Sequence, residues 1–99
     1  MLNITKTAEG GALTIALEGR LDTTTAPDLE AVWKESCEGV TDLTCDLASL
    51  AYISSAGLRV LLSMQKVMNK QGQMRVIHVS EDVMEVFEVT GFSDILTIE

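Results

Sequence analysis

Basic residues are scarce in this 99-residue chain: seven lysines and arginines stand against fifteen aspartates and glutamates, a formal net charge of −8. Nucleic-acid binding depends on clustered lysine and arginine that neutralise phosphates, so this balance argues against a nucleic-acid partner. It also argues against an anionic membrane surface, which attracts polybasic segments. The charge is compatible with a protein partner that offers a basic patch.

Long apolar runs are also missing, and proline occurs once. No run approaches the ~20 residues that cross a bilayer. The first residues, MLNITKTAEGG, lack the basic start and apolar stretch of a secretory signal, so we expect a cytoplasmic protein. With 46% hydrophobic residues the chain can bury a core, and its length predicts one domain over residues 1–99.

Side chains for metal or cofactor chemistry are few. Cys37 and Cys45 do not form a CxxC pair, and His78 is the single histidine, whereas a zinc site normally takes four ligands. The cysteines are expected to be buried, reduced thiols. His78 is expected on a strand face shared with Met74 and Val76. No P-loop, dinucleotide-binding or EF-hand pattern occurs, so no metal and no cofactor is predicted.

Apolar alternation in the first part of the chain predicts a β-hairpin. Residues 2–19 alternate on both sides of a glycine-bearing turn. The period then changes to that of a helix, with Thr25 as N-cap and Asp28 at N3 in an acidic variant of the capping box. Gly39 is expected to close this segment. Trp33 is expected to be its core anchor.

Strand and helix patterns alternate through the rest of the chain, in the order ββαβαβα with a possible final strand. Strand–helix–strand units favour parallel pairing, so we expect an α/β fold: a small mixed sheet of four to five strands covered by helices. Strand order does not follow from the sequence. The predicted segments are a strand ending near Asp46, an irregular stretch over 48–54, a helix ended by Gly72, a strand over 74–79, a helix over 81–89 with Ser80 as N-cap, and a short strand over 94–98.

Two serines precede the second predicted helix, in Ser54-Ser55-Ala56-Gly57. One interpretation is structural, because a serine at an N-cap satisfies an unpaired backbone N–H group. The other is regulatory, because a phosphate at a helix N-terminus is tolerated by free N–H groups and the helix dipole while it changes the surface for a partner. The residues alone permit both.

The chain resembles the STAS domain family (sulfate transporter and anti-sigma factor antagonist), in particular its free-standing bacterial anti-sigma factor antagonists. The similarity runs from Asn3 to Glu99. It is carried by four segments: LEGRLDTTTAPDLE, DLASLAYISSAGLRVLL, KQGQMRVIHVS and VMEVFEVTGFSDILTI.

The resemblance implies a partner switch. In this family an anti-sigma factor that is itself a serine kinase phosphorylates a serine of the second segment. The unphosphorylated protein binds that kinase and releases the sigma factor, and a PP2C-type phosphatase restores the binding form. The phosphorylated position falls on Ser55, with Ser54 as the alternative because it stands where the family has aspartate. The implied docking face comprises Asp22, Thr23, Thr24, Ser54, Ser55, Gly57 and Arg59.

Two other functions are possible from the sequence. One is a STAS scaffold or adaptor subunit of a lipid-transport or stress-signalling complex, without phosphorylation. The other is a serine-dependent hydrolase, but the segment around Ser55 lacks the G-x-S-x-G pattern, and a nucleophilic serine needs a base within reach. We therefore predict a binding module rather than an enzyme.

Overall fold

Alternating apolar side chains build the first two strands of the protein, whose computed structural model describes residues 2–99. β1 (Leu2–Glu9) and β2 (Ala12–Leu21) pair antiparallel around a two-residue turn. Gly10 in that turn has φ of 60°, a conformation that glycine adopts without steric cost. The predicted hairpin is confirmed.

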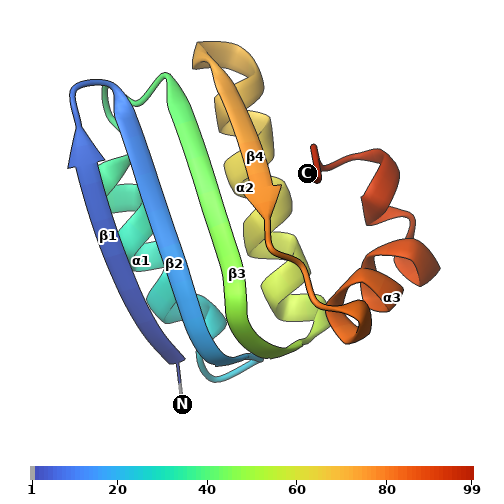
Figure 1. The fold of residues 1–99 in the computed structure, drawn as a ribbon. Helices are drawn as coiled ribbons and strands as arrows, with labels where there is room; N and C mark the ends of the chain where they lie inside the picture. Colours follow the sequence, from blue (N-terminus) through green and yellow to red (C-terminus); the bar gives the residue numbers. More distant parts are fainter. Residues whose placement is uncertain (1) are drawn as a thin grey trace.

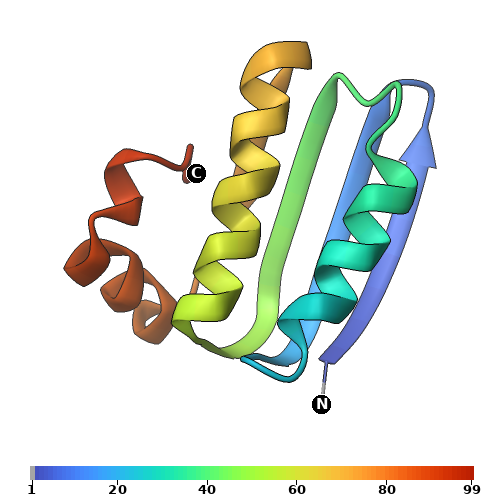
Figure 2. The same cartoon turned by 180° about the vertical axis from the view of Figure 1, so that it is seen from behind.

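One four-stranded sheet, in the order β1-β2-β3-β4, organises the fold. β2 pairs parallel with β3 and β3 pairs parallel with β4, so the sheet is mixed, as predicted. Figure 1 views the sheet from its open face, and Figure 2 shows α1 and α2 side by side on the opposite face. The further elements are α1 (Ala26–Ser36), β3 (Asp42–Ile53), α2 (Ser55–Gln71), β4 (Gln73–Ile77), α3 (Glu81–Thr90) and the short 3₁₀ helix η1 (Phe92–Asp94).

The core lies between the sheet and its helices. Trp33 is only 3% exposed and packs in this core, which confirms its predicted role. Each large apolar side chain buried in this way stabilises the fold by roughly 1.5–3 kcal/mol. The largest fully buried side chains are Ile15, Leu17, Leu21, Leu29, Leu43, Leu47, Leu61, Met64, Met68, Met74, Val76 and Phe87.

α3 and η1 lie beyond β4, beside the N-terminal end of α2 (Figures 1 and 2). Ser80 is the N-cap of α3, as predicted, and its hydroxyl accepts a hydrogen bond from the Val83 N–H at 3.3 Å. Among residues 2–99, no helix is both long enough and apolar enough to cross a membrane.

The third strand is longer than its sequence pattern indicates. We expected an end near Asp46 and an irregular stretch to residue 54, but β3 continues to Ile53. Two bulges explain the error, because β3 uses one extra residue against β2 between Asp46 and Ser49 and another between Leu50 and Tyr52. The bulges break the two-residue alternation on which the prediction depended.

The first helix begins differently from the prediction. Thr25 is its N-cap residue, but the side chain makes no capping hydrogen bond. The Thr25 hydroxyl donates to the carbonyl of Arg20 at 2.8 Å, and the Thr25 N–H donates to Asp22. The capping box with Asp28 is therefore wrong, because the preceding loop has taken the groups that would form it.

Three smaller expectations are also corrected. The final strand is reduced to a single parallel bridge between Val76 and Ile98. His78 lies outside β4 and is exposed, with Nδ1 3.0 Å from Asp46 Oδ1, and this contact lowers the pKa of Asp46. Burial raises the pKa of Cys45 to about 12, whereas Cys37 is only half-buried; both thiols are free.

We predict that Gly72→Ala destabilises the fold. A Cβ at this position would overlap the backbone carbonyl of Thr41, which is held by a hydrogen bond from the Gln73 N–H. Such overpacking costs about 1–3 kcal/mol or more. Urea denaturation should show this loss, while Gln73→Ala at the neighbouring exposed position should stay within about 0.5 kcal/mol of wild type. Equal stability of the two variants would contradict the overlap.

Candidate functional site

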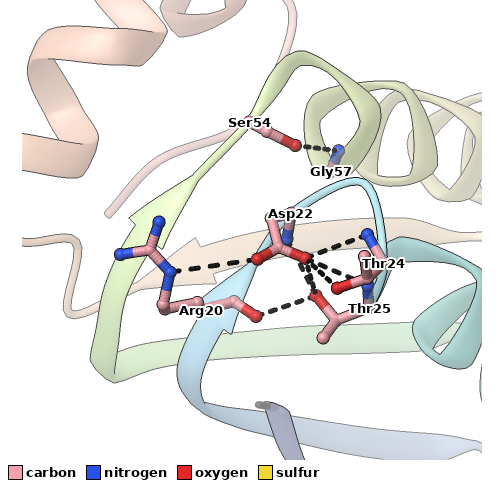
Figure 3. Close-up of polar contacts among 6 residues, drawn as sticks. All are labelled: Arg20, Asp22, Thr24, Thr25, Ser54 and Gly57. Carbon is pink, nitrogen blue, oxygen red and sulfur yellow. Dashed lines mark hydrogen bonds and ion pairs between the residues drawn. The ribbon is translucent and has the colours of Figure 1, made fainter.

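The carboxyl ends of β2 and β3 meet the N-terminal ends of α1 and α2 at one edge of the sheet. The backbone N–H of Ser54 donates to the carbonyl of Leu21 at 2.9 Å, which ties the start of α2 to the end of β2. Figure 3 shows that the Asp22 loop and the Ser54 turn face each other there. The structure therefore brings the two predicted parts of the docking face together.

Gly57 makes this approach possible. It is buried in the first turn of α2, and a Cβ there would lie 2.7 Å from Leu21 Cγ and 3.0 Å from Ile53 Cγ1. Both neighbours are core residues with almost no exposure and little freedom to move. Gly57 thus supports the site by close packing and offers no surface of its own.

The two serines have different local roles. Ser54 is the N-cap of α2, and its Oγ accepts a hydrogen bond from the Gly57 N–H at 3.4 Å. Ser55 is the first helical residue and is exposed, and its hydroxyl makes no hydrogen bond to any of residues 2–99 that the structure describes. The capping role therefore belongs to Ser54.

Asp22 organises the loop between β2 and α1. Its Oδ1 accepts hydrogen bonds from the Thr24 hydroxyl at 2.7 Å, the Thr24 N–H at 3.0 Å and the Thr25 N–H at 3.1 Å. The Asp22 N–H in turn donates to the Thr25 hydroxyl at 2.8 Å. The Thr24 hydroxyl does most to lower the pKa of Asp22, since hydrogen bonds to a carboxylate favour its charged form.

Two residues of this surface were missed by the sequence analysis. The Arg20 guanidinium lies 4.3 Å from the centre of the Tyr52 ring, and Arg20 Nε lies 3.8 Å from Asp22 Oδ2. Tyr52 is 40% exposed. The register that pairs Arg20 with Tyr52 depends on the bulges of β3, so no local sequence signal would have joined them.

A shallow groove of about 270 Å³ lies between the first turns of α1 and α2. Thr23 and Pro27 line it from one side, and Ala56 and Arg59 from the other. Arg59 is exposed, as the sequence predicts. Ala56, which lines this groove, follows Ser55 directly in the chain.

The charges near Ser55 suit an added anion. The first turn of α2 contains no acidic residue, so its unpaired N–H groups and positive dipole end are not already neutralised by a local carboxylate. No basic side chain of residues 2–99 forms a hydrogen bond with the Ser55 hydroxyl. The geometry is that of an exposed hydroxyl at a helix N-terminus.

Comparison with known families gives one clear match. The STAS domain matches residues 3–99 of this chain. BtrV of Bordetella bronchiseptica, described as an anti-sigma factor antagonist, is 37% identical over 90 residues, covering 89% of this chain and 78% of that protein. The anti-sigma-B factor antagonist of Staphylococcus aureus is 28% identical over 99 residues, which cover 98% of this chain and 92% of that protein.

Solved structures share the fold. An anti-sigma factor antagonist from Mycobacterium paratuberculosis superposes with a TM-score of 0.87 at 20% identity, covering 99% of this chain and 85% of its own. Unphosphorylated SpoIIAA superposes with a TM-score of 0.76 at 17% identity, covering 100% of this chain and 87% of its own. The phosphorylated form of Bacillus SpoIIAA superposes with a TM-score of 0.75, also at 17% identity, covering 100% of this chain and 91% of its own. These likenesses support the four-stranded sheet and its ββαβαβα order.

We predict that alanine substitution of the two serines changes the stability of the protein by different amounts. Ser54→Ala removes the cap of α2 and should lower the free energy of unfolding by about 0.5–1 kcal/mol. Ser55→Ala removes an exposed hydroxyl without a partner and should change it by less than about 0.5 kcal/mol. Urea denaturation of both variants beside wild type measures the difference. The reverse order would show that Ser55 carries the cap.

We also predict that Thr24→Ala raises the pKa of Asp22 towards its ordinary value, whereas Thr23→Ala, at an exposed neighbour, leaves it unchanged. A carboxyl pKa lowered by folding stabilises the protein above the unfolded pKa of about 4, and that stabilisation is lost as pH falls through the folded pKa. The stability lost in Thr24→Ala should therefore be greatest near neutral pH and shrink in acid. NMR titration of the Asp22 carboxyl carbon checks the pKa. Identical titrations in both variants would contradict the assignment.

Proposed function

Because the chain belongs to the STAS domain family, and relatives of similar length are named anti-sigma factor antagonists, we propose that it acts as an anti-sigma factor antagonist. In this proposal the unphosphorylated protein binds an anti-sigma factor that is a serine kinase, and the sigma factor is released. Phosphorylation of Ser55 ends the binding. The protein is then a substrate and binding partner of an enzyme, not an enzyme itself.

The observation that carries the proposal is the state of the Ser55 hydroxyl. It is exposed at the first position of α2, and no hydrogen bond to residues 2–99 restrains it. The Ser54 hydroxyl, in contrast, accepts the capping bond from Gly57. A kinase would find Ser55 accessible without disturbing the helix start, which favours Ser55 over Ser54 as the acceptor.

Phosphorylation at Ser55 would change the surface more than the fold. A phosphate there carries about −1.5 to −2 charges and meets the free N–H groups and positive dipole end of α2. Its bulk and hydration would stand beside the groove formed with Thr23 and Arg59. A partner seated over that groove would lose contact with it, while the Gly57 packing beneath stays intact.

The docking face in this proposal comprises four exposed side chains, Thr23, Thr24, Ser55 and Arg59, together with the half-buried Asp22 and Ser54. Asp22 acts mainly by holding the loop that presents the two threonines. Gly57 acts through packing. A PP2C-type phosphatase would restore the binding form, and a kinase that uses ATP implies that the cycle runs in the cytoplasm.

The relatives support a switch of this kind. SpoIIAA, which shares the fold, has been solved both unphosphorylated and phosphorylated, with nearly equal TM-scores to this chain. The proposal transfers that pair of states to Ser55. It is compatible with a fold that tolerates a phosphate.

Phosphosite mapping tests the proposal. The chain is incubated with Mg-ATP and each anti-sigma factor kinase encoded in the same genome, and the tryptic peptide from Glu35 to Arg59 is fragmented to separate the two serines. We expect phosphate on Ser55. We also expect Ser55→Asp to bind the kinase at least about tenfold more weakly than wild type, or ~1.4 kcal/mol. Ser55→Ala should bind persistently and resist release by ATP.

Ser54→Ala is the matched control, because it leaves the proposed acceptor in place. It should still be phosphorylated and released. Phosphate found only on Ser54 would move the acceptor by one residue. Equal kinase affinity for wild type, Ser55→Asp and Ser55→Ala, with no phosphate on either serine, would overturn the switch and favour a scaffold or adaptor role.

A further inference from the structure

The outer face of α3 carries an apolar strip that the protein itself does not cover. Val89 is 79% exposed, the highest value among the exposed large hydrophobic side chains of residues 2–99. With Val86 and Thr90 it lines a hollow of about 260 Å³, and Asp82 and Glu85 complete the lining. The core-facing side of α3 is separate, since Val83 and Phe87 are buried there.

The charge around this strip has one sign. Residues 79–99 hold six of the fifteen acidic residues and none of the seven basic ones: Glu81, Asp82, Glu85, Glu88, Asp94 and Glu99. The ion pairs within the described chain involve Asp22, Glu30, Asp42 and Asp46, and none of these six. Nothing in residues 2–99 therefore neutralises the acidic face of α3.

Part of this arrangement is repulsive within the helix. Glu81 and Glu85 are four residues apart and Glu85 and Glu88 three apart, so like charges face each other along the helix. The last turn of α3 has no basic residue to offset its negative dipole end, and Glu88 lies near that end. The apolar strip is a poor surface for water, and the unpaired acids beside it attract cations. Together they suit a cationic segment that also carries an apolar side chain.

We propose that the outer face of α3, defined by Asp82, Glu85, Val86, Val89 and Thr90, is a docking site for a lysine- or arginine-bearing segment of a partner protein that also carries a bulky apolar side chain. The apolar side chain fills the hollow at Val86 and Val89, and the cations pair with Asp82 and Glu85. Charge complementarity selects this occupant. A second copy of this chain would bring another acidic face, and nucleic acid would bring phosphates.

The site is distinct from the Ser55 surface and does not depend on the proposed switch. None of its lining residues belongs to the groove at Thr23 and Arg59. α3 lies beside the N-terminal end of α2 (Figure 1), so one partner could span both surfaces. The two sites are therefore tested with different variants.

The test uses an amphipathic helical peptide built only of leucine and lysine, with a glutamine-for-lysine version as the uncharged control. Isotope-labelled protein is titrated at physiological salt, and amide shifts are followed by NMR. We expect saturable shifts concentrated in residues 82–90. Glu85→Lys and Val89→Ser should each raise the Kd at least about fivefold, because one removes a counter-charge and the other an apolar contact.

Two control variants make the result specific. Glu38→Lys makes the same charge change at an exposed acid outside α3 and should alter the Kd less than about twofold. Ser55→Asp should leave it unchanged, so that a failure here is separate from a failure of the proposed switch. Shifts spread over the whole acidic surface, an equal loss in Glu38→Lys, or no binding would overturn the proposal. So would concentration-dependent shifts at 82–90 without peptide, which would assign the face to a second copy.

Discussion

The close approach of α2 to the ends of β2 and β3 is the constraint on which the candidate site depends. Gly57 has no Cβ, so the first turn of α2 can lie against Leu21 and Ile53, and the Ser54 N–H reaches the Leu21 carbonyl. A larger residue would lift the helix start from the sheet. This contact fixes where α2 begins, with the capping hydroxyl of Ser54 at its N-cap and the exposed Ser55 at its first position.

The surface above this contact divides its polar groups between holding the fold and remaining available. Asp22 and Thr25 are committed to hydrogen bonds within their loop, and Ser54 is committed to the helix cap. Ser55, Thr23 and Arg59 stay exposed around the groove. The hydrogen-bonded groups hold the surface in a fixed shape. The exposed groups form a surface whose charge would change if a phosphate were added at Ser55.

Much of the fold followed from the sequence, and the exceptions have a common cause. The hairpin, the end of α2 at Gly72 and the Ser80 cap depend on residues close in the chain, and local patterns predict them. The length of β3, the cap of α1 and the position of His78 do not, because each is decided by a neighbouring strand or loop. The bulges of β3 follow from its register with β2, and Thr25 turns to the Arg20 carbonyl instead of its own helix.

The sequence by itself determined the element order, the buried anchors such as Trp33, the acidity of the chain and its membership of the STAS domain family. Those properties lie in hydrophobic period, turn residues and motifs, which are local. Only the tertiary structure decided which serine caps α2, which residues meet Arg20, and that Val89 on α3 is left uncovered among unpaired acids. These depend on which groups remain unsatisfied or exposed once distant segments have packed, and no local pattern records that.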